Sequence, residues 1–180
     1  RVVFNDNGTM VQVAVTDLKT YIGGNPITLA DQWHITASID AGNSNTDTVI
    51  TNWTQDGYGG YGKIGTMSES SGVFTFPSTG IYLVSYLQEF AYAGDSAYVT
   101  AAINLTTDNS SYSNIAQTTD SINYTSGNWF ASASAQAMID ITNTTTHKVS
   151  FRADVSGTVI VKGNSTVSEN AVTFIRLGDT

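Results

Sequence analysis

The stretch that decides the fold runs from residue 72 to residue 84 and reads Gly72-Val73-Phe74-Thr75-Phe76-Pro77-Ser78-Thr79-Gly80-Ile81-Tyr82-Leu83-Val84. Its first half is a short strand-like segment that ends at Pro77, because proline has no amide hydrogen to give to a strand ladder. Ser78-Thr79-Gly80 then supplies turn-forming residues. An aromatic and aliphatic segment follows, so the stretch predicts two β-strands joined by a turn.

The composition extends this prediction to the whole chain. The 180 residues include 26 Thr, 19 Ser and 14 Asn, and 11% of the residues are aromatic. Such a composition favours strands and turns over helices. Strand-like runs separated by Gly, Asn, Asp and Ser cover residues 33–39, 48–53, 72–76, 80–92, 97–105, 115–124, 129–141, 148–155, 158–162 and 171–177. We therefore expect an all-β, antiparallel sandwich or barrel.

The first 26 residues have a character of their own. Residues 2–15 alternate around a turn at Asn5-Asp6-Asn7-Gly8, which predicts a hairpin, and Gly23-Gly24-Asn25-Pro26 then interrupts any regular structure. We expect a leader, neck or shaft end over residues 1–26 and the main domain over residues 27–180. Because the chain begins at Arg1 in strand-like sequence, we also expect it to be cut from a longer polypeptide.

Two strands are apolar on both faces. Ile81 and Leu83 alternate with Tyr82 and Val84, and the C-terminal strand alternates in the same way, whereas the 148–155 run is apolar on one face only. A single sandwich core covers one face of a sheet, so a neighbouring subunit is the expected cover for the other. The predicted interface residues are Ile81, Tyr82, Leu83, Val84, Phe174, Ile175 and Leu177. The alternative is a strand covered by its own loops or carrying exposed apolar side chains.

The deciding stretch also resembles a known family. Its pattern Gly-x-Phe-x-x-Pro-x-x-Gly-x-Tyr, from Gly72 to Tyr82, is similar to the signature of the tumour necrosis factor/complement C1q-like jelly-roll superfamily. Residues 172–178 resemble the closing strand of that family, although Ile175-Arg176 stands where a Gly-aromatic pair is common. The resemblance covers about residues 30–180 and implies a homotrimeric antiparallel jelly roll.

Within that superfamily the chain looks most like the C1q-like knobs of bacteriophage fibres or bacterial surface filaments. It has no collagen-like Gly-x-y run, no cysteine and a net charge of −8. This resemblance implies a non-enzymatic trimeric knob on a virion or an extracellular surface, with a host cell-surface glycan or protein as partner. The alternatives are a purely structural trimerisation cap and a monomeric glycan-binding or glycan-cleaving domain.

Several other functions are disfavoured by the residues themselves. Seven Lys and Arg against fifteen Asp and Glu do not suit a phosphate backbone, so no nucleic acid is expected. The longest apolar run, residues 81–84, is far shorter than the roughly 20 residues of a membrane span, so no membrane insertion is expected. The Gly57 to Lys63 motif is like a phosphate loop, but Ile64 stands where Ser or Thr is needed and no helix pattern follows.

Metal and catalytic sites have weak support. His34 and His147 are the only histidines and neither has a second ligand at a typical spacing, and no serine elbow is present. The one candidate for calcium is a run of oxygen ligands at Asp40, Asn43, Asn45 and Asp47. A turn rich in Asx residues explains the run equally well. We therefore expect no catalytic residues, no resident metal and no cofactor apart from this calcium alternative.

Aromatic residues in loop-like settings are the candidate receptor contacts, because flat amphipathic rings stack on sugars and anchor interfaces. They are Trp53, Tyr58, Tyr61, Tyr112, Tyr124 and Trp129. Core packing is the alternative role for the tryptophans, and a flexible Gly-rich loop is the alternative setting for Tyr58 and Tyr61.

Overall fold

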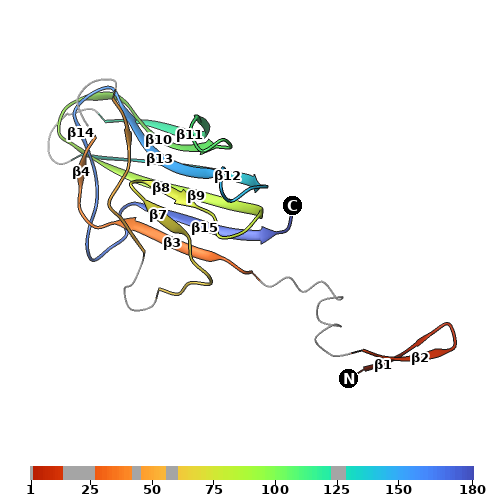
Figure 1. Cartoon of the computed structure of the whole chain (residues 1–180). Helices are drawn as coiled ribbons and strands as arrows, with labels where there is room; N and C mark the ends of the chain where they lie inside the picture. The colour runs from red at the N-terminus through yellow and green to blue at the C-terminus, as the bar shows by residue number, and fades with distance from the viewer. Residues whose placement is uncertain (1, 14–26, 42–45, 56–60, 123–128) are drawn as a thin grey trace.

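Two antiparallel sheets packed face to face make up the main body of the chain (Figure 1). The computed structural model describes residues 2–13, 27–41, 46–55, 61–122 and 129–180. No residue in these ranges is helical, which confirms the all-β prediction. Nor does the described part contain a helix long and apolar enough to cross a membrane.

The N-terminal hairpin consists of β1 (Val2–Asp6) and β2 (Thr9–Val13), with Val2 paired to Val13. Asn7 and Gly8 form its turn with φ of 50° and 91°, as a two-residue hairpin turn with the right twist requires. The predicted hairpin is therefore confirmed, with its strands ending at Val13. Figure 1 shows it away from the sandwich. The domain boundary near residue 26 lies outside the described residues and stays a prediction.

One sheet has seven strands and is built around the long strand β9 (Gly80–Tyr92). One edge of β9 pairs along its length with β12 (Phe130–Ile141). The other edge is shared by β15 (Ala171–Gly178) and β14 (Val159–Val161). The sheet continues from β15 through β3 (Ala30–Ile35) to β6 (Trp53–Gln55), and from β14 to β4 (Ile39–Asp40).

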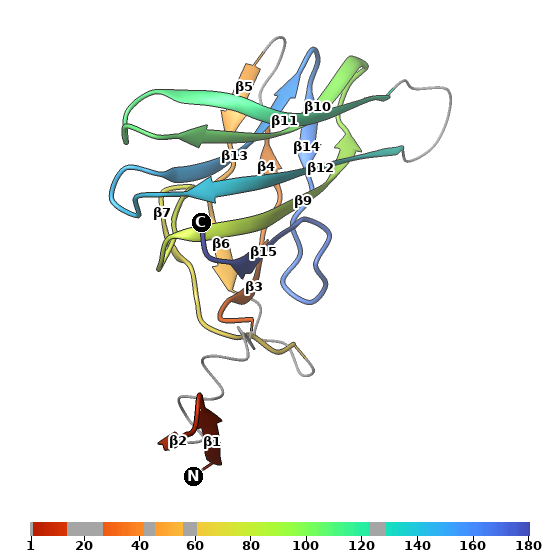
Figure 2. The same ribbon diagram turned by 90° about the vertical axis from the view of Figure 1, so that its right-hand side faces the viewer.

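The second sheet has six strands. Its order is β11 (Tyr112–Ile122), β10 (Ser96–Thr106), β13 (Lys148–Val155), β8 (Val73–Thr75) and β7 (Ser68–Ser70), and β5 (Thr46–Val49) also pairs with β13. β11 and β12, the edge strands of the two sheets, lie side by side (Figure 2). The sequence does not predict β7; it pairs with β8 across Ser71 and Gly72, which both have positive φ.

The deciding stretch forms β8, the turn and the start of β9, as predicted. Gly80 has φ of 137°, a conformation that side chains with a Cβ rarely adopt. A Cβ at Gly80 would also lie 2.4 Å from the carbonyl oxygen of Gly178. The glycine therefore lets β9 begin directly against the end of β15. Beside the turn, the ring of Phe76 packs 4.7 Å from that of Tyr82.

The core lies between the sheets and is rich in aromatic rings. Phe74 lies at its centre and is fully buried. Its ring centroid is 5.8 Å from that of Trp53, 5.5 Å from that of Phe151 and 5.1 Å from that of Phe174. Tilted and edge-to-face aromatic pairs of this kind add stability beyond the area that they bury. The core therefore joins strands of both sheets through Phe74 of β8, the first strand of the stretch from residue 72 to residue 84.

Candidate functional site

The outward side chains of β12, β9, β15 and β3 form one surface, the outer face. Strand register arranges them in rows across the sheet. One row is apolar, since Met138 lies opposite Leu83, which in turn lies opposite Ile175. The next row is polar and contains Gln136, Ser85, Thr173 and Gln32 in the same order of strands. The outer face therefore combines an aliphatic row with a parallel row of hydroxyl and amide groups.

The aliphatic side chains of this face are open to solvent. Met138 is 73% exposed, Leu87 is 47% exposed, and Phe130 at the end of β12 is 55% exposed. Leu83 and Ile175 are half-buried beside them. Long apolar side chains on rigid neighbouring strands are typical of a surface that another molecule covers.

A shallow depression of about 380 Å³ lies over the polar row. It forms there because Ser85, Ser134 and Ala171 are too small to fill the space between the longer side chains around them. Gln136 Nε2 donates a hydrogen bond of 2.8 Å to Ser85 Oγ inside it. The lining residues are Gln32, Ser85, Tyr86, Leu87, Ser134, Ala135, Gln136, Ala171 and Thr173. They are uncharged, so hydrogen bonding and shape would govern what binds here.

The predicted interface residues divide between the two sides of the sheet. Ile81, Leu83, Ile175 and Leu177 are half-buried or exposed in the single chain. The prediction is wrong for the other three. Tyr82, Val84 and Phe174 have no exposed surface and belong to the core. Alternation alone does not say which of two apolar faces points inward.

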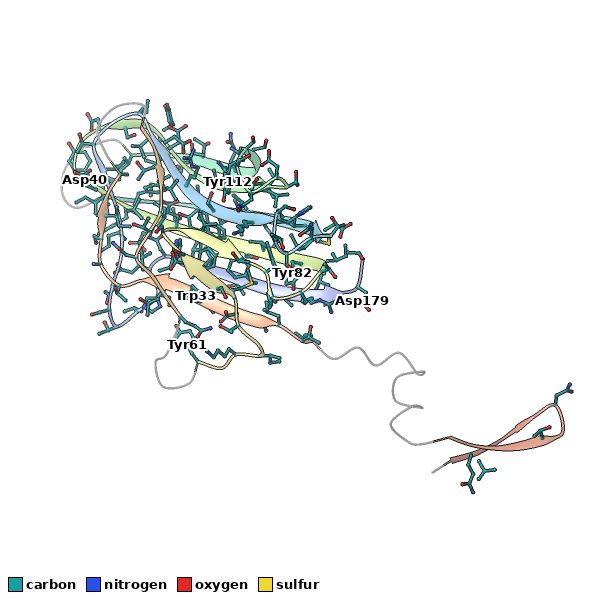
Figure 3. The ribbon with its side chains drawn as sticks, viewed as in Figure 1. Trp33, Asp40, Tyr61, Tyr82, Tyr112 and Asp179 are labelled. Carbon is teal, nitrogen blue, oxygen red and sulfur yellow. The ribbon has the colours of Figure 1, made fainter. Side chains whose placement is uncertain are left out.

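The aromatic residues predicted to contact a receptor lie in different environments. Trp53 is 6% exposed, lies among the core aromatics and donates its indole N–H to the Ile50 carbonyl oxygen over 2.9 Å, so the prediction of a surface contact is wrong for this residue. Tyr61, Tyr112 and Trp129 are 45%, 36% and 37% exposed. Figure 3 shows Tyr61 and Tyr112 on opposite sides of the sandwich, so they do not form one patch. Tyr58 and Tyr124 lie outside the described residues.

Asp31 is a buried carboxylate that the sequence analysis does not single out. It is 2% exposed and accepts hydrogen bonds from Trp33 Nε1 at 2.9 Å, Gln55 Nε2 at 2.7 Å and the Met67 amide at 2.7 Å. These donors satisfy the buried oxygens and tie β3 to β6 and to the segment before β7. Its partners indicate a structural role.

Two further carboxylates are perturbed by their surroundings. Partial burial and the neighbouring Asp47, its partner across the β13–β5 pair, raise the pKa of Asp154 above its ordinary value. Backbone amides of Ser111 and Ser110 and the Thr106 hydroxyl donate to Asp108 and hold its pKa well below the ordinary value. Asp108 thus stabilises the turn between β10 and β11.

The structure describes half of the candidate calcium run. Asn43 and Asn45 lie outside the described residues, and Asp47 forms an ion pair with Arg152. Across the described ranges, no three His, Asp or Glu side chains are grouped so as to hold a metal ion. The two histidines lie in different settings. His34 on β3 is 1% exposed. The ring nitrogens Nε2 and Nδ1 of His147 lie 3.3 and 3.1 Å from the hydroxyl oxygens of Thr142 and Thr146.

The outer face includes residues that the sequence analysis missed. Met138, Phe130 and Leu87 are among its most exposed apolar side chains, yet none is among the predicted interface residues. The sequence of β12 does contain a pattern that indicates this face. Ala131, Ala133 and Ala135 face inward, and the larger or polar residues that alternate with them face outward.

The fold is that of the tumour necrosis factor-like jelly rolls. The structure of Eiger TNF from S. frugiperda matches with a TM-score of 0.65 and 13% identity, over 86% of this chain and 96% of that one. Murine APRIL, crystallised at pH 8.5, matches with a TM-score of 0.58 and 9% identity, over 83% and 98% of the two chains. Neither a protein-family model nor a curated protein sequence matches the chain. At these identities the likeness shows the fold alone, and it confirms the jelly roll expected from residues 72–84.

Proposed function

We propose that this chain is a non-enzymatic head domain that assembles as a homotrimer and binds a partner on another surface. The observation that carries the proposal is the aliphatic row of Met138, Leu83 and Ile175 on the outer face. A sister copy is the proposed cover, because a second layer over this sheet would bury the row as the core buries its inner side. The trimeric state implied by the family resemblance gives the number of copies.

The mass of the particle in dilute solution tests the assembly. We expect a species three times the 19.1 kDa mass of the chain, and we expect Leu83→Asp to reduce it to a single folded chain. Gln117→Asp is the matched control, because it adds the same charge at an exposed position of β11 in the other sheet. A wild-type protein that stays a folded monomer at every concentration would refute the proposal.

For the partner, we propose a host-surface glycan or protein, with the chain acting as the knob of a fibre or surface appendage on a virion or cell. Exposed rings at Tyr61, Tyr112 and Trp129 are the proposed contacts, since rigid aromatic side chains lose little entropy on binding. Binding of the purified trimer to host cells is the assay. Tyr61→Ala and Trp129→Ala should weaken it without changing the oligomeric state. If neither variant weakens binding, these contacts are wrong, and a purely structural cap becomes the better account.

One observation favours a second candidate function, a monomeric glycan-binding domain. The depression on the outer face is lined by Gln32, Gln136, Ser85 and Thr173, and amide and hydroxyl groups can recognise sugar hydroxyls. A trimer that covers the outer face would leave this depression closed to a free glycan. Binding of neutral oligosaccharides to a 19.1 kDa species, abolished by Gln136→Ala, would therefore select this function over the trimer.

A further inference from the structure

Two side chains just after β14, those of Lys162 and Asn164, contact the carboxylate of Glu169. Lys162 Nζ lies 3.2 Å from Glu169 Oε2, and Asn164 Nδ2 donates to Glu169 Oε1 over 3.3 Å. The carboxylate therefore touches an amine on one oxygen and a carboxamide on the other. An amine is a nucleophile once it has lost its proton, a carboxamide carbon is an electrophile, and a carboxylate between them can move the proton.

The carboxamide of Asn164 is also polarised. Its Oδ1 accepts two hydrogen bonds from Thr166, one from the backbone amide at 2.8 Å and one from the hydroxyl at 2.8 Å. Donors placed on a carbonyl oxygen stabilise the negative charge that forms there when the carbon is attacked. The oxygen of Asn164 thus has the partners of a small oxyanion hole, and its nitrogen faces the group that would protonate it as it leaves.

The backbone around these residues is held firmly. The Lys162 amide donates to the Glu89 carbonyl at 2.9 Å, and the Asn164 amide donates to the Ile35 carbonyl at 3.0 Å. Gly163 lies between them, where a Cβ would come within 2.4 Å of the Ala37 backbone. Fixed positions of this kind lower the entropy cost of bringing the two reacting groups together.

The amine end is partly shielded from water. The Lys162 and Glu169 side chains are 25% and 21% exposed, and Glu169 Oε2 itself is closed to solvent. Lys162 Nζ also lies 5.7 Å from the centre of the Phe130 ring. Proton transfer from the ammonium to the carboxylate must precede any attack, and the contact of 3.2 Å between Lys162 Nζ and Glu169 Oε2 gives that proton a direct path.

The geometry points to a self-catalysed isopeptide bond between Lys162 and Asn164, with Glu169 as the proton carrier. Glu169 takes a proton from the Lys162 ammonium, and Nζ then attacks Asn164 Cγ. The Nζ–Cγ bond forms and the Cγ–Nδ2 bond breaks. Nζ loses two protons in all: Glu169 relays one of them to Nδ2, which leaves as ammonia, and releases the other to water. The reaction needs no oxidant, metal or cofactor. It does not depend on the proposed assembly, since all three residues belong to one chain.

Mass spectrometry of the purified full chain tests this inference. The intact protein should be lighter than its sequence by the mass of one ammonia, and trypsin should fail to cleave after Lys162, leaving residues 153–176 as one peptide. Glu169→Gln should restore the full mass, and so should Lys162→Arg, which keeps the positive charge. Lys148→Arg is the matched control at an unrelated lysine and should keep the mass deficit.

Two results would overturn the inference. One is a wild-type chain of full sequence mass with normal cleavage after Lys162. The other is a chain that has lost ammonia yet is still cleaved there, because an Asn164 succinimide would give the same mass loss without a bond to the lysine. That second product would also persist in Lys162→Arg.

Discussion

Shortening Met138 tests the role of the outer face most directly. The side chain is 73% exposed in the single chain, and full burial of a methionine is worth about 1.5–3 kcal/mol. Covering the exposed part would therefore stabilise an assembly by about 1–2 kcal/mol per subunit. In a trimer with three equivalent contacts, Met138→Ala should cost about 3–6 kcal/mol, which raises the trimer dissociation constant by roughly 10²–10⁴-fold.

Sedimentation equilibrium over a dilution series measures this change. The folded single chain should lose little stability, because changes at exposed positions usually stay within about 0.5 kcal/mol. Val167→Ala is the matched control, since Val167 is 56% exposed in the segment between β14 and β15 and not on the outer face. The assignment of the outer face as the interface would be refuted if the two substitutions changed the trimer dissociation constant equally. It would also be refuted if the wild-type chain is a trimer and neither substitution changes that constant.

Three further substitutions test the fold. Gly80→Ala should lower the free energy of unfolding by more than about 1 kcal/mol, because it places a Cβ at a φ of 137° against Gly178, whereas Gly62→Ala, with open space around it, should not. Chemical denaturation compares the two. Phe74→Ala should cost about 3–5 kcal/mol in the same assay, since it empties the centre of the aromatic core. Asp108 has a lowered pKa, so its stabilising effect is present above the unfolded-state pKa of about 3.9 and is lost as the pH falls below it. Asp108→Asn should therefore lower the melting temperature at neutral pH. The melting temperature of this variant should also decrease less on acidification than that of the wild-type chain.

Much of the sandwich is predictable from local sequence. Strands 80–92 and 148–155 have the predicted bounds, because each begins and ends at clear turn residues and alternates without interruption. The turn at Pro77 to Gly80 is equally local, since it follows from the missing amide of proline and the positive φ open to glycine. These features need no knowledge of what packs against them.

The short strands are less predictable. β7, with three residues, has no apolar alternation of its own and exists because β8 gives it a partner. β4, with two residues, likewise depends on β14. Such strands are set by tertiary pairing, so propensity within a short window does not reveal them.

The buried carboxylate shows the same limit for sites. Asp31 is polar and lies in a strand, where sequence would place it in water. Its donors come from Trp33 nearby and from Gln55 and Met67, which are distant along the chain. The Lys162, Asn164 and Glu169 group is close in sequence, but its geometry depends on how the backbone between β14 and β15 turns.

In β9, side-chain volume indicates which of the two apolar faces points into the core, which alternation alone does not. The inner face must fill the space of about 10 Å between two packed sheets, and it takes the large rings of Tyr82, Tyr86 and Phe90. The outer face takes the smaller Leu83 and Leu87, which can project into solvent or meet another molecule. Ring content in the sequence therefore distinguishes the core residues of β9 from its candidate interface residues. An outer face of this kind need only keep the single chain folded before assembly, so its aliphatic row can stand beside a polar one, whereas a polar group buried in the core costs stability wherever it lacks a hydrogen-bond partner.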